Sequence, residues 1–380
     1  MTGRAAAAVP ARPPRDLRLD VLRGWMQVSI FVSHVAGTAF AWSIHASWGL
    51  SDSSEEFVLL SGLSLGSVFA LKAARDGAGV ARADLLRRTA RLTGAHAALF
   101  AAFAALVLLA QRAMPLPREA ERLGFGWLVE EPWEAIPAAA TLLYQPAFMG
   151  ILPIFIWCMI ALPAFLWLAD RVGAWALLPS LLLYGAVQPG WIATPAIGGD
   201  GIAFDPLAWQ LLFMIGAYFG RRTLLEGVGV PRRPWLVGAA GAVVAFGLWA
   251  RLVGYGVLPG PEPAAAALLL GKEVLAPPRL LHALSLAYLV AVLVPREARW
   301  MHSAPALPLA AIGRRSLRVF CFGVPLAWAA ATALARWPGD APWLDPALVL
   351  GGVAALAAIA YWPPRRGREA SRRAPVRAAA

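Results

Sequence analysis

The sequence predicts an all-α, polytopic integral membrane protein with about ten transmembrane helices and both termini in the cytoplasm. Of its 380 residues, 59% are hydrophobic and only 15% are charged, too little polar surface to cover a soluble globule of this length. The apolar residues gather into runs that approach the ~20 residues needed to cross a bilayer. The 17 tryptophans are typical of chains whose rings lie at membrane interfaces.

The apolar runs define one membrane domain between two tails. Residues 1–15 are predicted to be a disordered cytoplasmic tail, residues 16–364 the transmembrane domain, and residues 365–380 a basic cytoplasmic tail. Pro189 and Pro206 interrupt the fifth and sixth runs, because proline breaks helix geometry. The predicted spans are residues 19–42, 55–74, 86–111, 150–169, 174–190, 206–220, 234–254, 279–295, 310–334 and 345–362.

Lysine and arginine set the orientation, because they collect in cytoplasmic loops. With the N-terminus inside, 26 of the 34 Lys and Arg residues fall in inside segments and 7 in outside segments, and Arg23 lies within the first run. The loss of one span would invert every later loop and scramble this bias. The net charge of +12 is explained by basic loops that face an anionic leaflet, so the lipid bilayer is an expected partner and nucleic acid is not.

The first run carries a polar stripe that is unusual for a membrane span. Arg23 and His34 are eleven residues apart, a rotation of about 1100°, which is within about 20° of three full turns. Asp20 and Gln27 fall on the same face and are predicted to contact substrate. The eleven residues rise about 16 Å, roughly half of a hydrocarbon core of about 30 Å. Ionisable groups are costly there, so each is a candidate functional residue.

His34 is the candidate catalytic base. A neutral imidazole, with an ordinary pKa of about 6.5, can take a proton from an acceptor hydroxyl that arrives from outside. The alternative is a histidine that is hydrogen-bonded between packed helices. The stripe that His34 shares with Arg23 favours the functional interpretation.

Arg23 has two interpretations. It lies three residues after Asp20, so the two side chains could neutralise each other near the inner surface. Alternatively, its guanidinium binds a phosphate or carboxylate of a charged substrate from the cytoplasm. Both can hold.

Asp52 and Glu55 stand where the second run begins, at the predicted outer mouth. An acidic residue there is often a partner for the helix dipole. The alternative makes both of them candidate catalytic residues, because one could orient His34 and raise its basicity, as the third member of a triad does. Behind them, small residues are predicted to serve close helix packing: Ser61, Gly62, Ser64, Gly66 and Ser67.

Two further pairs are candidate substrate contacts at the outer side. Arg279 and His282 share a face of the eighth run and either line an acceptor cleft or serve the structure. Tyr144 and Gln145 precede the fourth run, where Pro146 favours a loop that folds back over the site.

The cysteines predict no metal chemistry. Cys158 and Cys321 lie within predicted spans and lack the Cys/His spacing of a metal site. They are expected to be core residues, and no metal ligands are predicted.

Six segments match the pattern of a known family. The first, LDVLRGWMQVSIFVSH, has an arginine, ten residues and a histidine, here Arg23 and His34. Five later blocks occur in the family's order: WGLSDSSEEFVLLSGLSLG, LLYQPAFMGILPIF, FDPLAWQLLFMIGAYFGRR, RLLHALSLAYL and IGRRSLRVFCFG. Over residues 15–335 the chain resembles the OpgC family of the membrane-bound acyltransferase 3 superfamily.

The resemblance implies an enzyme of the bacterial inner membrane. Such an enzyme moves an acyl group, for example succinyl, from cytoplasmic acyl-CoA to an extracytoplasmic carbohydrate such as a periplasmic glucan. Carried over by motif, His34 would be the catalytic base, Arg23 would contact the donor, and Glu55 stands at the family's acidic position. Acyl-CoA would be a substrate, and no permanently bound cofactor is expected.

The expected mechanism is direct transfer in a ternary complex, because no Ser, Cys or Thr stands out as a nucleophile. Arg23, with Arg87, Arg88 and Arg91, would offset the phosphates of acyl-CoA. The pantetheine arm would then reach up towards His34.

The chain departs from the family pattern at two positions. Gly150 stands where the family has an aspartate, and Phe155 where it has a tyrosine. If that aspartate contacts the acceptor or the acyl carboxylate, the substrates of this protein differ from succinate and glucan.

The rival interpretation is a proton-coupled transporter or flippase of a carbohydrate or an acyl-bearing solute. Intramembrane charges and broken helices are also typical of carriers. A carrier is expected to contain internal repeats, and the sequence has no convincing second copy of the first-run stripe.

Overall fold

The chain is helical throughout the part that the computed structural model describes, which is residues 15–114, 116, 118–198, 201–260, 270–337 and 341–363. No strand occurs among these residues, which confirms the all-α fold class. Apart from Arg15, the predicted tails at residues 1–15 and 365–380 lie outside the described residues.

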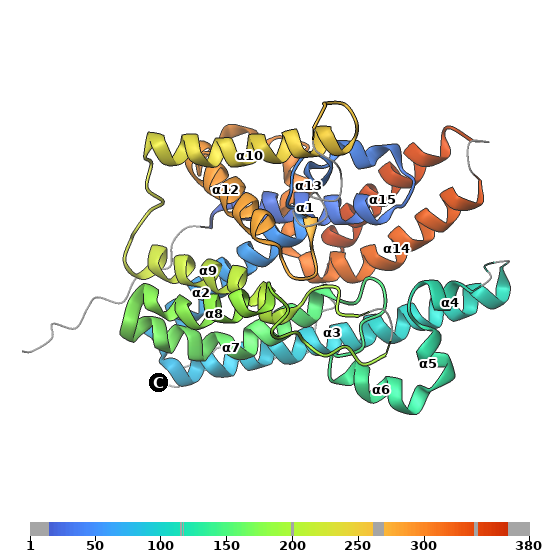
Figure 1. The fold of residues 1–380 in the computed structure, drawn as a ribbon, viewed down its shortest axis with the longest axis horizontal. Helices are drawn as coiled ribbons and strands as arrows, with labels where there is room; N and C mark the ends of the chain where they lie inside the picture. The colour runs from blue at the N-terminus through green and yellow to red at the C-terminus, as the bar shows by residue number, and fades with distance from the viewer. Residues whose placement is uncertain are drawn as a thin grey trace, which may run out of the picture.

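Long helices form most of the described chain, and shorter helices lie in the connections. Short α4, α5 and α6 cluster at one end of the molecule, and α10 lies along an edge (Figure 1). The helices that make up the body of the fold are α1 (Leu17–His34), α2 (Ser53–Asp76), α3 (Ala78–Ala113), α7 (Ile151–Val172), α8 (Leu178–Val187), α9 (Pro206–Leu225), α10 (Pro234–Gly254), α12 (Pro277–Leu293), α13 (Ala306–Arg314), α14 (Ser316–Arg336) and α15 (Leu344–Tyr361). The short ones are η1 (Ala39–Ser43), η2 (His45–Ser47), α4 (Glu119–Arg122), α5 (Gly126–Glu130), α6 (Pro132–Ala140), η3 (Gly173–Leu177) and η4 (Arg299–His302).

Six helical stretches within the described residues are long and apolar enough to cross a membrane. They are α2, α3, α10, α14, α15 and the stretch Ile151–Val187, which joins α7 and α8. α12 is apolar but has only 17 residues, and the 18 residues of α1 include Arg18, Asp20 and Arg23. The count of about ten spans and the side of the termini therefore stay predictions.

α1 is shorter than the predicted span. It begins after Asp16, whose side chain accepts a hydrogen bond from the Arg18 N–H, and it ends at His34. Gly37 follows with a φ of +87°, which favours glycine, and Thr38 then caps η1 through its side chain. The prediction of one helix over residues 19–42 is thus wrong in extent, and His34 is the last residue of the helix.

The ninth predicted span, residues 310–334, is also not one helix. α13 ends at Arg314 and α14 begins at Ser316, with Arg315 at φ −123° and ψ 29° between them. The apolar pattern continues across this break, which is why the sequence did not reveal it.

Glycines bring α2 and α9 together at backbone distance. A Cβ atom at Gly62 or Gly66 of α2 would collide with a carbonyl oxygen of α9, and one at Gly216 or Gly220 of α9 would collide with a carbonyl oxygen of α2. Ser67 also donates a hydrogen bond to the Gly220 carbonyl at 2.9 Å. The prediction that this Ser/Gly pattern serves close helix packing is confirmed.

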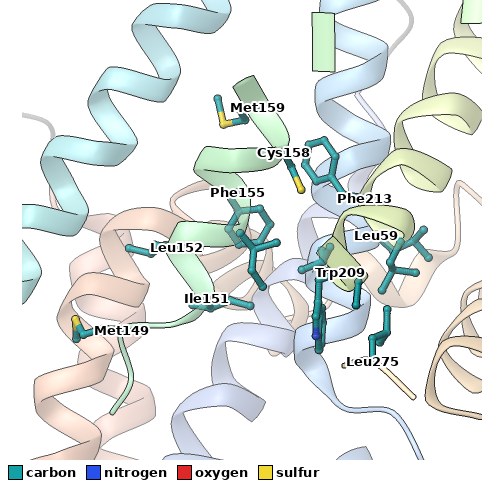
Figure 2. Packing of buried hydrophobic residues seen from close by; sticks show 14 of the residues in the cluster. Leu59, Met149, Ile151, Leu152, Phe155, Cys158, Met159, Trp209, Phe213 and Leu275 are labelled. Carbon is teal, nitrogen blue, oxygen red and sulfur yellow. The ribbon is translucent and has the colours of Figure 1, made fainter. Parts of the chain in front are cut away.

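The largest core cluster surrounds α7 and α9 (Figure 2). Trp209, which is fully buried, donates its indole N–H to the carbonyls of Lys272 and Glu273 at 3.0 and 3.1 Å. This contact fixes the segment before α12 against the core. Cys158 is buried in the same cluster and forms no disulfide, as expected for a core residue.

Connections predicted on the same side of the membrane contact one another. At the predicted outer end, the Asp205 N–H donates to the Glu273 carbonyl at 2.9 Å. At the predicted inner end, Arg18 donates to the Val294 carbonyl at 2.7 Å. The side of the membrane on which each connection lies stays a prediction.

Candidate active site

Arg23 lies one turn after Asp20 on the polar face of α1, and its side chain points at α2. Its Nη2 donates to the Leu60 carbonyl at 2.9 Å and to the Ser64 hydroxyl at 2.7 Å. Its Nε and Nη1 make no hydrogen bond with any described residue. The guanidinium is therefore held by one nitrogen, and its other N–H groups remain able to bind an anion.

Asp20 does not form an ion pair with Arg23 among the described residues. Its carboxylate binds Arg15 at 2.6 Å and lies 4.0 Å from Arg314. The side chain is buried, although Arg15 is largely exposed. Asp20 thus joins the start of α1 to α13, and Arg23 is left without a carboxylate partner.

His34 ends α1 with its ring against a strained loop residue. Its ring meets Phe148 edge to face, with centroids 4.7 Å apart. Phe148 has a φ of +69°, a conformation that non-glycine residues adopt at a cost of about 1–3 kcal/mol and that is common at functional sites. The ring nitrogens of His34 have no hydrogen-bond partner within the described chain. Either nitrogen can therefore serve an incoming hydroxyl.

A narrow cavity runs beside the same face of α1. A cavity of about 10 Å³, room for about one water molecule, lies between α1, α14 and α15, and Gln27 and His34 are its polar lining residues. The remaining lining residues are apolar or glycine: Ile30, Phe31, Val319, Phe320, Gly323, Val324 and Leu356.

Asp52 and Glu55 begin α2 with a capping box. The Asp52 carboxylate accepts from the Ser54 N–H at 2.8 Å, and the Glu55 carboxylate accepts from the Asp52 N–H at 2.9 Å. Such reciprocal bonds satisfy two free donors of the helix start. Capping of the helix start therefore explains part of the role of Asp52 and Glu55.

The same two carboxylates also bind one cation from the first turn of α12 and one from the segment before it. Arg279 donates to Glu55 at 2.7 Å and to Asp52 at 3.1 Å, and Lys272 lies 2.7 Å from Asp52. Glu55 is fully buried and Arg279 is 4% exposed. We call these four residues the outer ion cluster.

The outer ion cluster keeps Asp52 ionised. Burial alone would raise the pKa of the Asp52 carboxyl, but the charges of Lys272 and Arg279 hold that pKa well below its usual range. Neither Asp52 nor Glu55 is hydrogen-bonded to His34. An orienting contact to His34 is thus absent from the described geometry, although the role of the two carboxylates in catalysis stays a prediction.

A second polar group lies beside this cluster and includes the predicted residue His282. The Ser51 hydroxyl lies 2.8 Å from a Glu56 oxygen and 2.7 Å from His282 Nδ1, and His45 Nε2 lies 3.4 Å from the other Glu56 oxygen. Ser51 is fully buried and His282 is 3% exposed. We call His45, Ser51, Glu56 and His282 the histidine chain.

The histidine chain joins three elements. Gly49 and Gly247 pack against the His282 ring so closely that a Cβ on either would collide with it. Burial alone would lower the pKa of His45, but its hydrogen bond to Glu56 raises that pKa above the usual value. α12 therefore meets the start of α2 twice, through Arg279 and through His282.

Tyr144 and Gln145 lie in the loop before α7. The Tyr144 hydroxyl donates to the Gly124 carbonyl, which ties this buried residue to the α4–α5 connection. Gln145 donates to the Leu142 carbonyl at 2.9 Å, but its buried Oε1 has no partner among the described residues. Of the two, Gln145 is the one with hydrogen-bonding capacity to spare.

Gly150 packs closely against Phe204 and Gln145. A Cβ atom there would lie 2.9 Å from the Phe204 ring and 3.1 Å from Gln145 Oε1. Lys272 lies over that Phe204 ring at 5.2 Å. Phe155, the other departure, is a core residue whose ring packs against Phe57.

The three arginines predicted to bind phosphates lie on α3. Arg87 and Arg88 pair with Asp84 at 3.6 and 2.9 Å, and Asp84 also binds Lys72. Arg91 is exposed and has no ion pair among the described residues. The structure thus provides an exposed basic face on α3 but no hydrogen bond or ion pair from it to Arg23.

Four contributors escaped the sequence analysis. Ser51 and Glu56 flank the predicted acidic pair, so the two consecutive glutamates in one motif were a signal for Glu56. Lys272 was counted only as an outside charge. Phe148 meets His34 across 114 residues of sequence, and no local pattern marks it.

A model of the OpgC protein family matches residues 15–367, nearly the whole chain. The resemblance drawn from the sequence blocks is thereby confirmed. No curated protein and no solved structure matches the chain.

Proposed function

The chain belongs to the OpgC family, and from this membership we propose that it is a membrane acyltransferase that acts on glucans. In its finer form, the proposal is the transfer of an acyl group, such as succinyl, from cytoplasmic acyl-CoA to a sugar hydroxyl outside. The distribution of Lys and Arg supports an inner membrane location with both termini in the cytoplasm.

The observation that carries the proposal is the state of His34. Its ring borders a cavity, packs against the strained Phe148 and has no hydrogen-bond partner within the described chain. Side-chain polar atoms that lie between packed helices are hydrogen-bonded in the large majority of cases. This histidine is instead available for general-base chemistry.

In the proposed step, His34 acts first as a base and then as an acid. His34 takes the proton of the sugar hydroxyl while the hydroxyl oxygen attacks the thioester carbonyl. The carbon–sulfur bond breaks, and the CoA sulfur receives the proton that His34 has gained. Arg23 supports donor binding, because its Nε and Nη1 are free of hydrogen bonds within the described chain and can meet a phosphate.

Direct transfer is favoured over a covalent intermediate. Ser51 contacts a histidine and a glutamate, the partners that a nucleophilic serine needs. However, Ser51 is fully buried, and Gly49 and Gly247 pack against the His282 ring. The histidine chain has no room for an acyl group, so we assign it to structure.

The acyl group and the acceptor are proposed to be recognised by polar side chains near Gly150. The unpartnered Gln145 Oε1 and the half-exposed Lys272 face the region around Phe204. Lys272 supports an anionic group such as a succinyl carboxylate, and Gln145 supports a sugar hydroxyl. The rival function, a transporter or flippase, needs no acyl-CoA.

The proposed activity is tested by measuring which acyl groups the glucans carry. Mass spectrometry of periplasmic and surface glucans from cells with and without the protein would identify the added acyl group. We expect His34→Ala to lower transfer at least about 100-fold while the protein still folds in the membrane. His96→Ala is the matched control, because His96 is a buried histidine whose Nδ1 also lacks a partner in the described chain. Undiminished transfer by His34→Ala would refute the mechanism.

The direction of transfer is tested separately. A topology reporter at Glu119 should report the outside, and one at Arg368 should report the cytoplasm. The opposite result at either position would reverse the orientation, and with it the sides of donor and acceptor.

A further inference from the structure

Phe148 adopts a backbone conformation that favours glycine. Its φ is +69°, and a bulky residue in this left-handed region is an outlier that calls for an explanation. Leu142 in the same loop and Leu275 before α12 also have a positive φ, but both side chains are buried in the core. Phe148 is only half-buried. Core burial therefore explains the two leucines better than it explains Phe148.

The Phe148 ring contacts rings from two helices. It meets the His34 ring at the end of α1, with centroids 4.7 Å apart and ring planes at 86°. It also meets Phe103 of α3, with centroids 5.8 Å apart and planes at 76°. Aromatic rings attract one another in this edge-to-face arrangement. Because Phe103 is fully buried, Phe148 connects the His34 ring to a fixed part of the core.

Hydrogen bonds hold the loop on both sides of Phe148. The Ala147 N–H donates to the Leu123 carbonyl at 2.9 Å, and the Met149 N–H donates to the Pro146 carbonyl at 3.0 Å. The Met149 side chain is fully buried. The neighbours of Phe148 therefore impose its strained conformation, and its ring has little freedom to move away.

His34 lacks the hydrogen bond that usually orients a catalytic histidine. Such a base is normally held by a second group that bonds its other ring nitrogen. Neither Asp52 nor Glu55 makes this bond, and the His34 nitrogens have no hydrogen-bond partner within the described chain. The contact with Phe148 is what the described structure offers in its place.

We propose that Phe148 is a positioning residue, whose ring fixes the orientation of the His34 imidazole for proton transfer. The inference rests on the proposed function. It explains the strained φ, because glycine would suit the backbone but would carry no ring. It also gives the contact a kinetic weight, because a displacement of about 1 Å in a reacting group can cost about 100-fold in rate.

The first test removes the ring and relieves the backbone. In Phe148→Gly, we expect kcat to fall roughly 10- to 100-fold, while the KM values for succinyl-CoA and glucan stay unchanged. Loss of an interaction that acts only in the transition state has this signature. Phe148→Ala should show the same kcat but a lower thermal midpoint, because alanine keeps the unfavourable positive φ. Equal kcat values at different stabilities would separate positioning from folding.

The controls vary the side chain and the position. Phe148→Tyr keeps the ring and should retain kcat within about twofold, whereas Phe148→Leu keeps apolar bulk without a ring and should lose kcat as Phe148→Gly does. Leu142→Gly makes the same backbone change in the same loop. It should lower the thermal midpoint, because it removes a buried side chain, and should leave kcat unchanged.

Three results would overturn the inference. Wild-type kcat in Phe148→Gly or in a folded Phe148→Leu would show that the ring does not position the base. A raised KM with kcat retained would make Phe148 a substrate contact. An equal loss of kcat in Leu142→Gly would show that any change in this loop acts through the fold.

The same assay of His34→Ala separates this inference from the proposed function. If His34→Ala is inactive and Phe148→Gly is fully active, the base stands and the positioning role is refuted. If His34→Ala is fully active, the proposed base is refuted, and the positioning role is refuted with it.

Discussion

The start of α2 and the polar face of α1 both carry buried polar side chains, but they differ in how completely these are paired. In the outer ion cluster, each carboxylate has a cation and a backbone N–H as partners. On α1, Gln27 Nε2 has no partner, and Arg23 uses one of its three nitrogens within the described chain.

The difference separates architecture from ligand binding. Charged groups that fully satisfy one another hold α2 against α12 and have little capacity left for a substrate. Groups with unused donors and acceptors beside a cavity have that capacity. Removing a residue of the first kind should therefore affect folding, and removing one of the second kind should affect kinetics.

The largest effect is expected for Arg279→Leu. The change leaves Glu55 buried without its cation, so the free energy of unfolding should fall by about 3–5 kcal/mol, measured by denaturant titration in detergent. Adding Glu55→Leu should recover much of the loss, because it removes the unpaired charge. If Arg279→Leu kept full stability and lost only activity, the outer ion cluster would be a substrate site.

Arg23→Ala should act on the donor. The loss of a charged hydrogen bond to phosphate should raise the KM for acyl-CoA roughly 10- to 100-fold, with little change in thermal stability. Ser64→Ala is the control, because it removes one of the two protein acceptors of Nη2 and keeps the guanidinium. A KM that stays at the wild-type value in Arg23→Ala would remove the donor role.

Ser51→Ala should lower the free energy of unfolding and leave acyl transfer unchanged. It leaves Glu56 and His282 without their shared hydroxyl, at a cost of about 1–3 kcal/mol in unfolding free energy. The adjacent Ser53→Ala should be neutral, because Ser53 Oγ is buried and has no partner among the described residues. Complete loss of transfer in a folded Ser51→Ala protein would instead identify a covalent nucleophile.

The smallest effect concerns pH and His45. Because Glu56 raises the pKa of His45, the pair stabilises the folded state below the ordinary histidine pKa of about 6.5, and this contribution is lost as pH rises through the raised value. The gain should stay below about 1 kcal/mol. Thermal midpoints of the wild type and of His45→Gln, compared from pH 5 to 9, should converge at high pH. Parallel curves would show that the pair does not titrate.

Local patterns predicted much of this molecule. Apolar runs identified the helices, the Ser/Gly repeat predicted the α2–α9 contact, and an eleven-residue spacing placed Arg23 and His34 on one face. All of these depend on residues within one or two helices. The family match agrees with the motif around Arg23 and His34.

Long-range partners could not be predicted in this way. Arg279 meets Glu55 across 224 positions, and the sequence offered no reason to prefer it over another cation. The end of α1 at His34 depends on a single glycine conformation at Gly37. The unpaired state of Gln27 depends on where α14 and α15 pack, which only the folded chain reveals.

The glycines between α2 and α9 also determine where this protein can tolerate mutation. At Gly62, Gly66, Gly216 and Gly220, even alanine would push one backbone away from the other. A random substitution at any of them therefore displaces a whole helix, and with it both the outer ion cluster and the partner of Arg23. Sequence variation has to arise elsewhere, at positions where a new side chain moves only its neighbours.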